Sequence, residues 1–199
     1  MRRSARSSCA CSFLPMPVVN FDQLPAGARV WVFASDRPLH QAEAGVLLAA
    51  VDGFLSQWKA HGAPLRSARD WRDDRFLAIG VDPTAEQSSG CSIDGLFRGL
   101  QALEDRLNTR LVQGGRVFYR DAKGVPVLAL RKEVPMLFER GTIGDNTPVF
   151  DTSITDAAAW RERFERPARE TWVASLLAST HPNQPSSRSA TKSSSARNG

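Results

Sequence analysis

Apolar positions along the first half of the chain predict two strands and two long helices. The β-branched and aromatic run 29–34 predicts a strand, and the apolar run within 75–82 predicts a buried second strand. Apolar residues recur at helical spacing between 40 and 61 and again between 92 and 111, which predicts a helix over each range. The residues that carry the two stripes include Leu47, Val51, Phe54 and Trp58 in the first, and Leu96, Leu100, Leu103 and Leu107 in the second.

The second half predicts shorter elements. Residues 117–119 and 125–130 favour two strands joined by a hairpin loop that contains Gly124, and Pro126 favours an edge position for the second of them. The remaining expectations are a short helix over 133–140, an extended segment over 147–151, a helix from a Thr155 cap through Glu165, and a final helix beginning at Pro167.

This order of elements predicts an α/β or α+β domain. We expect one mixed sheet of four to five strands, in the order β-α-β-α-β-β followed by small helices, with both long helices packed on it. The first strand, first helix and second strand form a right-handed crossover if the two strands are parallel.

Composition divides the 199-residue chain into a domain and two tails. Residues 1–15 are expected to be a disordered extension, 20–180 a single globular domain and 181–199 a disordered, Ser-rich tail. The formal charge is +5, but residues 1–15 and 182–199 hold 6 of the 26 basic residues and none of the 21 acidic ones. We therefore expect nucleic-acid binding only through the basic tails, because the body lacks a basic excess.

Cysteine content and hydropathy bear on the compartment. Cys9, Cys11 and Cys91 do not form a disulfide framework, which indicates a reducing, cytoplasmic environment. No apolar run is long enough for a membrane span. No spacing of His, Cys or acidic residues indicates a metal, and no nucleotide-binding fingerprint is present, so we expect no cofactor.

One turn could carry chemistry. It lies between the predicted buried strand and the second long helix, where exposed helix N–H groups could hold an anion. The candidate ligand-binding residues are Ser88, Ser89, Gly90, Cys91, Ser92 and Asp94.

Cys91 is the candidate nucleophile within this turn. The helix dipole favours its thiolate, whereas the negative charge of Asp94 opposes it, so the sequence leaves its activation open. A thiol enzyme also needs a base. His40 follows the first strand directly, and in the crossover arrangement it lies at the same edge of the sheet as Cys91. We therefore take His40 as the candidate base for Cys91. The alternative is that Cys91 is a small structural residue with no catalytic role.

Several strings resemble one protein family over residues 20–175. The most distinctive is Ser-Gly-Cys-Ser-Ile-Asp at 89–94, and others are 30–33, 58–62, 75–76, 119–121 and 149–151. Together they resemble a family of short uncharacterised bacterial proteins, some of which carry the label "ABC transporter ATPase". The resemblance implies no mechanism. The chain has no G-x-x-x-x-G-K-[ST] loop, so we do not expect ATPase activity.

Two functions follow as hypotheses. The first is a protein that binds a small ligand, an anion among the candidates, or a protein partner at the turn 88–94. The alternative is a thiol-dependent enzyme or redox-responsive protein that uses Cys91.

Overall fold

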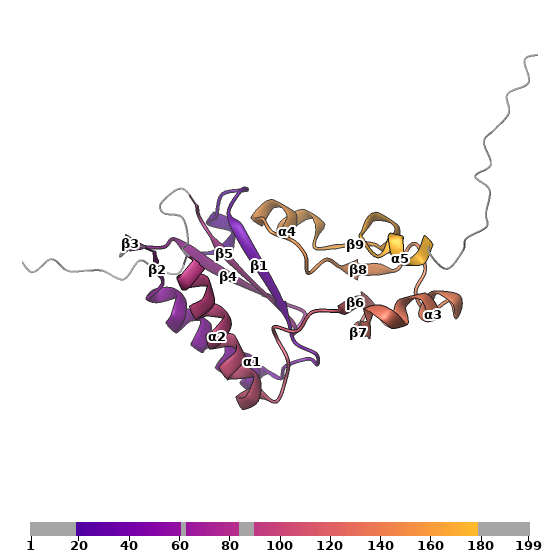
Figure 1. Ribbon diagram of the computed structural model, residues 1–199, viewed down its shortest axis with the longest axis horizontal. Coiled ribbons are helices and arrows are strands. Elements are labelled where there is room, and N and C mark those ends of the chain that lie inside the picture. Colours follow the sequence, from indigo (N-terminus) through magenta and orange to yellow (C-terminus); the bar gives the residue numbers. More distant parts are fainter. Residues whose placement is uncertain (1–18, 61–62, 84–89, 179–199) are drawn as a thin grey trace, which may run out of the picture.

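The computed structural model describes residues 19–60, 63–83 and 90–178. The predicted extension 1–15 and tail 181–199 lie outside these ranges. The described chain combines helices with two antiparallel sheets (Figure 1). None of its helices is long and apolar enough to cross a lipid bilayer.

The first sheet has the strand order β1-β5-β4, and every pairing in it is antiparallel. Its strands are β1 (Arg29–Ala34), β4 (Ser67–Arg72) and β5 (Phe76–Val81). The helices α1 (Gln41–Ser56) and α2 (Gly90–Leu107) cover one face of it (Figure 1). A two-residue pairing of β2 (Lys59–Ala60) with β3 (Ala63–Pro64) follows α1.

The second sheet has the order β7-β6-β8-β9. Its strands are β6 (Arg116–Arg120), β7 (Pro126–Leu130), β8 (Pro148–Phe150) and β9 (Glu165–Pro167). The smaller helices are α3 (Val134–Glu139), α4 (Ala157–Arg163) and α5 (Ala174–Ala178), with short 3-10 turns at Phe21–Gln23, Arg131–Glu133 and Ala168–Glu170. As predicted, β6 and β7 form a hairpin, and β7 is an edge strand.

The expected single mixed sheet is wrong, because the sequence pattern does not predict β4. The charged run 70–75 is typical of a solvated loop, but in the structure it ends one strand and forms the turn to the next. Asp73 and Asp74 have φ of 52° and 51°, the left-handed backbone of a tight turn, which closes where the Arg75 N–H donates to the carbonyl of Arg72 at 3.1 Å. Because of this hairpin, β5 runs antiparallel to β1, and no crossover joins β1 directly to β5.

The charged sequence of β4 is explained by its two faces. Arg69 points toward α1 and forms an ion pair with Asp52 at 2.6 Å. Asp70 lies on the opposite face, where it accepts a hydrogen bond from the indole N–H of Trp160 at 2.8 Å. The side chains of β4 therefore alternate between the two faces of the sheet, as in any strand. However, polar side chains with fixed partners occupy positions where apolar residues usually indicate a strand.

Boundaries of the helices also differ from expectation. The first helix ends at Ser56 rather than 61, and α2 occupies 90–107 rather than 92–111. The cap of α4 is Asp156, whose carboxylate accepts from the Ala159 N–H at 2.8 Å, and not Thr155. Pro167 ends β9 and does not begin a helix, because the chain there pairs with Pro148.

Three apolar clusters fill the spaces between these layers. One lies between the first sheet and the two long helices, and includes Leu77 and Leu100. A second lies on the other face of that sheet and joins it to the second sheet through Phe76, Phe118 and Trp160. The third lies between the second sheet and the helices α3 and α5.

We expect Leu100→Ala to lower the free energy of unfolding by about 2–5 kcal/mol, because it opens a cavity in the first cluster. Leu100 is 1% exposed. Leu130→Ala is the matched control: Leu130 is 39% exposed, and its loss should cost less than about 1 kcal/mol. Chemical denaturation measures both, and equal costs would contradict the assigned core.

An ion pair joins the start of α1 to the end of α2. Arg37 donates to Glu43 at 2.6 Å and also to the carbonyl of Leu107 at 2.6 Å. The hydrogen bond from Arg37, supported by the backbone N–H of His40, lowers the pKa of Glu43 from 4.5 to about 2. The ionised Glu43 thus helps to fix the relative position of the two helices.

This lowered pKa predicts a pH dependence. Its stabilising effect should be complete above pH 4.5 and should be lost as the pH falls toward 2, because protonation removes the charge that Arg37 binds. Denaturant midpoints should therefore fall more steeply over this range in the native protein than in Glu43→Gln. Parallel curves for the two proteins would contradict the assignment.

Candidate functional site

The predicted turn lies largely outside the described side chains. Asp94 is exposed on the first turns of α2. Ser88 and Ser89 fall outside the described residues, and of Gly90, Cys91 and Ser92 only the helical backbone is described. Ligand binding at this turn, and the activation of Cys91, therefore stay predictions.

The structure does not bring His40 to Cys91. His40 is exposed and precedes α1, at the end of the sheet where Arg37 donates to the carbonyl of Leu107, the last residue of α2. Cys91 lies at the other end of this 18-residue helix, about 25 Å away at 1.5 Å per residue. The proposed pair was wrong because it assumed parallel strands, and the antiparallel pairing of β1 with β5 puts the two helix starts at opposite ends of the sheet.

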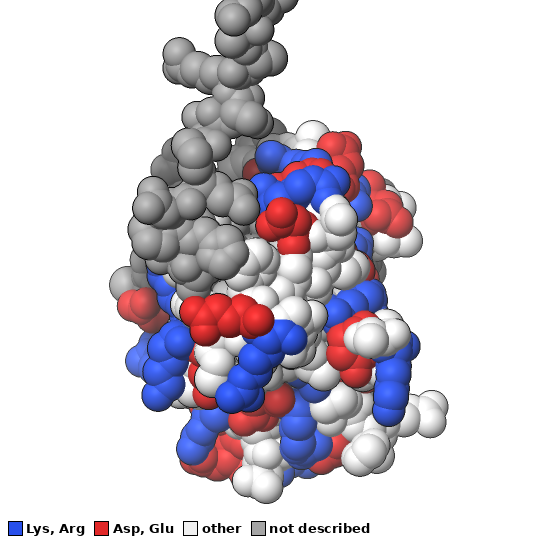
Figure 2. All heavy atoms as spheres, turned by 90° about the vertical axis from the view of Figure 1, so that its right-hand side faces the viewer, with Lys and Arg blue, Asp and Glu red and all other residues white. Residues whose placement is uncertain are grey.

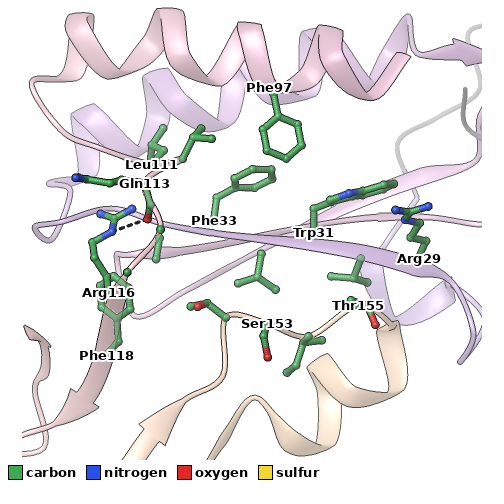
Figure 3. A pocket seen from close by; sticks show the side chains of 18 residues that line it. Arg29, Trp31, Phe33, Phe97, Leu111, Gln113, Arg116, Phe118, Ser153 and Thr155 are labelled. Carbon is green, nitrogen blue, oxygen red and sulfur yellow. Dashed lines mark hydrogen bonds between the residues drawn. The ribbon is translucent and has the colours of Figure 1, made fainter. Parts of the chain in front are cut away.

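A cavity of about 420 Å³ lies along the outer edge of β1 (Figure 3). We call it the β1-edge cavity. Its walls are the whole of β1, the loop 111–115 with the start of β6, and the segment 152–155 that leads into α4, together with Phe97 and Phe118. The pleat of β1 directs Trp31 and Phe33 toward α2 and leaves the other face of the strand toward Ser153 and Thr155 (Figure 3).

Among the residues that the structure describes, the charged side chains that line this cavity are two arginines, which lie at its opposite ends (Figure 3). Arg29 lies over the ring of Trp31, at 4.9 Å from the centroid. Arg116 is 8% exposed, and donates to the carbonyls of Gln113 at 2.9 Å and Arg110 at 3.0 Å. Burial lowers the pKa of Arg116, and the carboxylates of Asp36 and Glu104 oppose this shift.

A third arginine lies behind the cavity wall. Arg75 is 4% exposed, and its Nε and Nη1 atoms form no hydrogen bond with any part of the chain that the structure describes. Its guanidinium lies 5.8 Å from the ring centroid of Phe118, and that of Arg116 lies 5.7 Å from the same centroid. Burial lowers the pKa of Arg75, and the like charge of Arg116 lowers it further.

One carboxylate, Asp36, acts electrostatically on both Arg75 and Arg116. Burial raises its pKa, but hydrogen bonds outweigh this effect and the pKa is lowered overall. The strongest of these bonds comes from the hydroxyl of Thr109, at 2.6 Å. Asp36 is thus ionised, bound elsewhere and shared by the two arginines, and Glu104 is a second carboxylate that acts on Arg116.

Neither buried arginine is predicted by the sequence pattern. Arg75 belongs to a charged run that is typical of a solvated surface loop, whereas the described structure buries it without an ion pair. The sequence offers only the positions of the two residues as signals. Arg75 directly precedes a fully buried strand, and Arg116 begins a strand that follows Gly114 and Gly115. Neither signal distinguishes a buried arginine from an exposed one.

The described residues contain no group of three or more His, Cys, Asp or Glu side chains placed to hold a metal ion. No protein-family model, curated protein or solved structure matches this chain. The resemblance noted from the sequence motifs therefore stays a prediction, and the function is argued from the cavity.

Replacing Arg75 tests whether its buried charge is uncompensated. We expect Arg75→Met to raise the free energy of unfolding by roughly 1 kcal/mol or more, because a buried unpaired charge is replaced by a side chain of similar length. Arg116→Met should instead lower it by about 1–3 kcal/mol, because two backbone carbonyls lose a charged donor. Urea denaturation compares them, and a loss of stability in Arg75→Met would show that its guanidinium holds the fold together.

Proposed function

We propose that the protein binds a small anionic ligand, a carboxylate or a phosphate, in the β1-edge cavity. The observation that carries the proposal is the charge of the lining, in which Arg29 and Arg116 are cationic and none of the described side chains is acidic. Arg75 adds positive charge from behind the ring of Phe118. An anion in the cavity would offset part of the cost of burying the charges of Arg75 and Arg116.

The cavity also has the size and polarity of a ligand site. Its volume lies within the range of about 300–1,000 Å³ that is typical of small-molecule pockets. Phe33, Phe97 and Leu111 supply apolar surface, while Ser153 and Thr155 supply hydroxyl groups. Arg116 has further N–H donors on its guanidinium beyond the two atoms that bind carbonyls.

Binding is favoured over catalysis at this site. The lining contains no Asp, Glu, His, Cys or Lys side chain among the described residues, so no ordinary general acid or base faces the ligand. Extended nucleic acid is also disfavoured, since Figure 2 shows basic and acidic side chains intermixed on the face that it presents.

We expect Arg116→Gln to weaken anion binding by at least tenfold, because it removes a charge-assisted donor from the cavity. Isothermal titration with inorganic phosphate and with glutarate measures this at low ionic strength. Arg110→Gln is the matched control: Arg110 is 55% exposed and does not line the cavity, so affinity should stay within about twofold.

Arg75→Met provides an independent variant that leaves the lining intact. It should weaken binding of the same anion by about two- to fivefold through lost charge alone. If neither phosphate nor glutarate binds the native protein, or if Arg116→Gln and Arg75→Met both bind as it does, the proposed function is wrong. Circular dichroism of each variant confirms that it is folded.

A further inference from the structure

The backbone of β1 alternates between two sides. The N–H of Ser35 donates to the carbonyl of Arg75 at 3.0 Å, which by the antiparallel register places Phe33 and Trp31 in hydrogen-bonded pairs with β5. The N–H of Val30 instead donates to the carbonyl of Thr155 at 2.8 Å, on the other side. The same alternation directs the N–H and C=O groups of Val32 away from β5.

Only the beginning of this outer edge is covered. The carbonyl of Ala28 accepts from the N–H of Ala157 at 3.0 Å, and Arg29 forms an isolated antiparallel bridge with Asp156. Toward Thr152 the covering segment leaves the strand and becomes a wall of the cavity. In the described ranges, no backbone group outside the first sheet forms a hydrogen bond with Val32. The β1-edge cavity thus occupies the position of the next strand.

An open strand edge favours one kind of ligand. Unpaired backbone groups at a sheet edge bind extended peptides by adding a strand, and proteins normally cover or charge such edges. At Val32 no described residue covers the edge, and the charged side chains beside it are basic: the cavity has Arg116 at the Ala34 end of β1 and Arg29 at the opposite end (Figure 3). A peptide with a carboxylate matches both the hydrogen-bonding pattern and the charge.

We propose that the ligand of the β1-edge cavity is a short acidic peptide segment, which pairs with Val32 as an added strand and places a carboxylate on Arg116. This inference rests on the proposed function and specifies its ligand class. It requires main-chain amides in the ligand, whereas the proposed function requires only an anion.

The test uses the full-length protein and a synthetic peptide pool. The pool contains acetylated pentapeptides that end in Glu with a free carboxylate and are randomised at the first four positions. A control pool ends in glutamine amide. We expect the native protein to enrich members of the acidic pool over the control, and we expect Arg116→Gln to abolish that enrichment.

N-methylation of an enriched peptide then tests strand pairing. Methyl groups on alternate amides should weaken binding at least tenfold, and methyl groups on the intervening amides should change it by less than threefold, because only every second amide faces β1. Val32→Pro removes the outward N–H while sparing the ladder to β5, so it should weaken peptide binding about fivefold more than it weakens glutarate binding.

The outcomes separate the two proposals. If glutarate binds in an Arg116-dependent way but no peptide is enriched, or if methylation has no alternating effect, the peptide inference fails and the proposed function stands. If glutarate, phosphate and both pools all fail to bind, both fail. A concentration-dependent dimer in sedimentation that Val32→Pro abolishes would show that a second copy occupies the edge, and would also overturn the inference.

Discussion

The ring of Phe118 joins the two sheets and fixes the charges between them. It belongs to β6 of the second sheet, and it contacts Phe76 of the first at 5.2 Å between centroids in an edge-on arrangement. The guanidiniums of Arg75 and Arg116 both lie within 6 Å of the same ring. Cation–π attraction is worth about 0.5–2 kcal/mol per contact and offsets only part of the cost of burying a charge. The junction that builds the core therefore also creates a positive, poorly solvated region.

Local elements were predictable where apolar residues repeat with a single period. The strand over 29–34, both long helices and the β6–β7 hairpin all follow such patterns, as does the edge position of β7. The sheet topology was not predictable, because it depends on β4. That strand carries Arg69, which pairs with Asp52 of α1, and Asp70, which binds the indole of Trp160 in α4 as well as Arg72 in its own strand. A pattern based on hydrophobicity cannot anticipate such partners.

The site shows the same limit more sharply. An anion was among the ligands expected from the sequence, but the predicted binding site was the turn 88–94 at the start of α2, which contains Cys91. In the structure, the charged side chains that the described residues place along β1 are Arg29 and Arg116, which lie far apart in the sequence. Burial of Arg75 and Arg116 follows from how the two sheets meet, and nothing local in the sequence determines it.

Fold and proposed function are linked by one geometrical fact, which is that β1 is an edge strand whose outer side opens into a space bounded by arginine. The most direct measurement is an anomalous diffraction map from crystals soaked in bromide. Our account predicts a bromide peak inside the β1-edge cavity, within hydrogen-bonding distance of the Arg116 guanidinium. Bromide bound only at outer surfaces, with none in the cavity, would contradict the account.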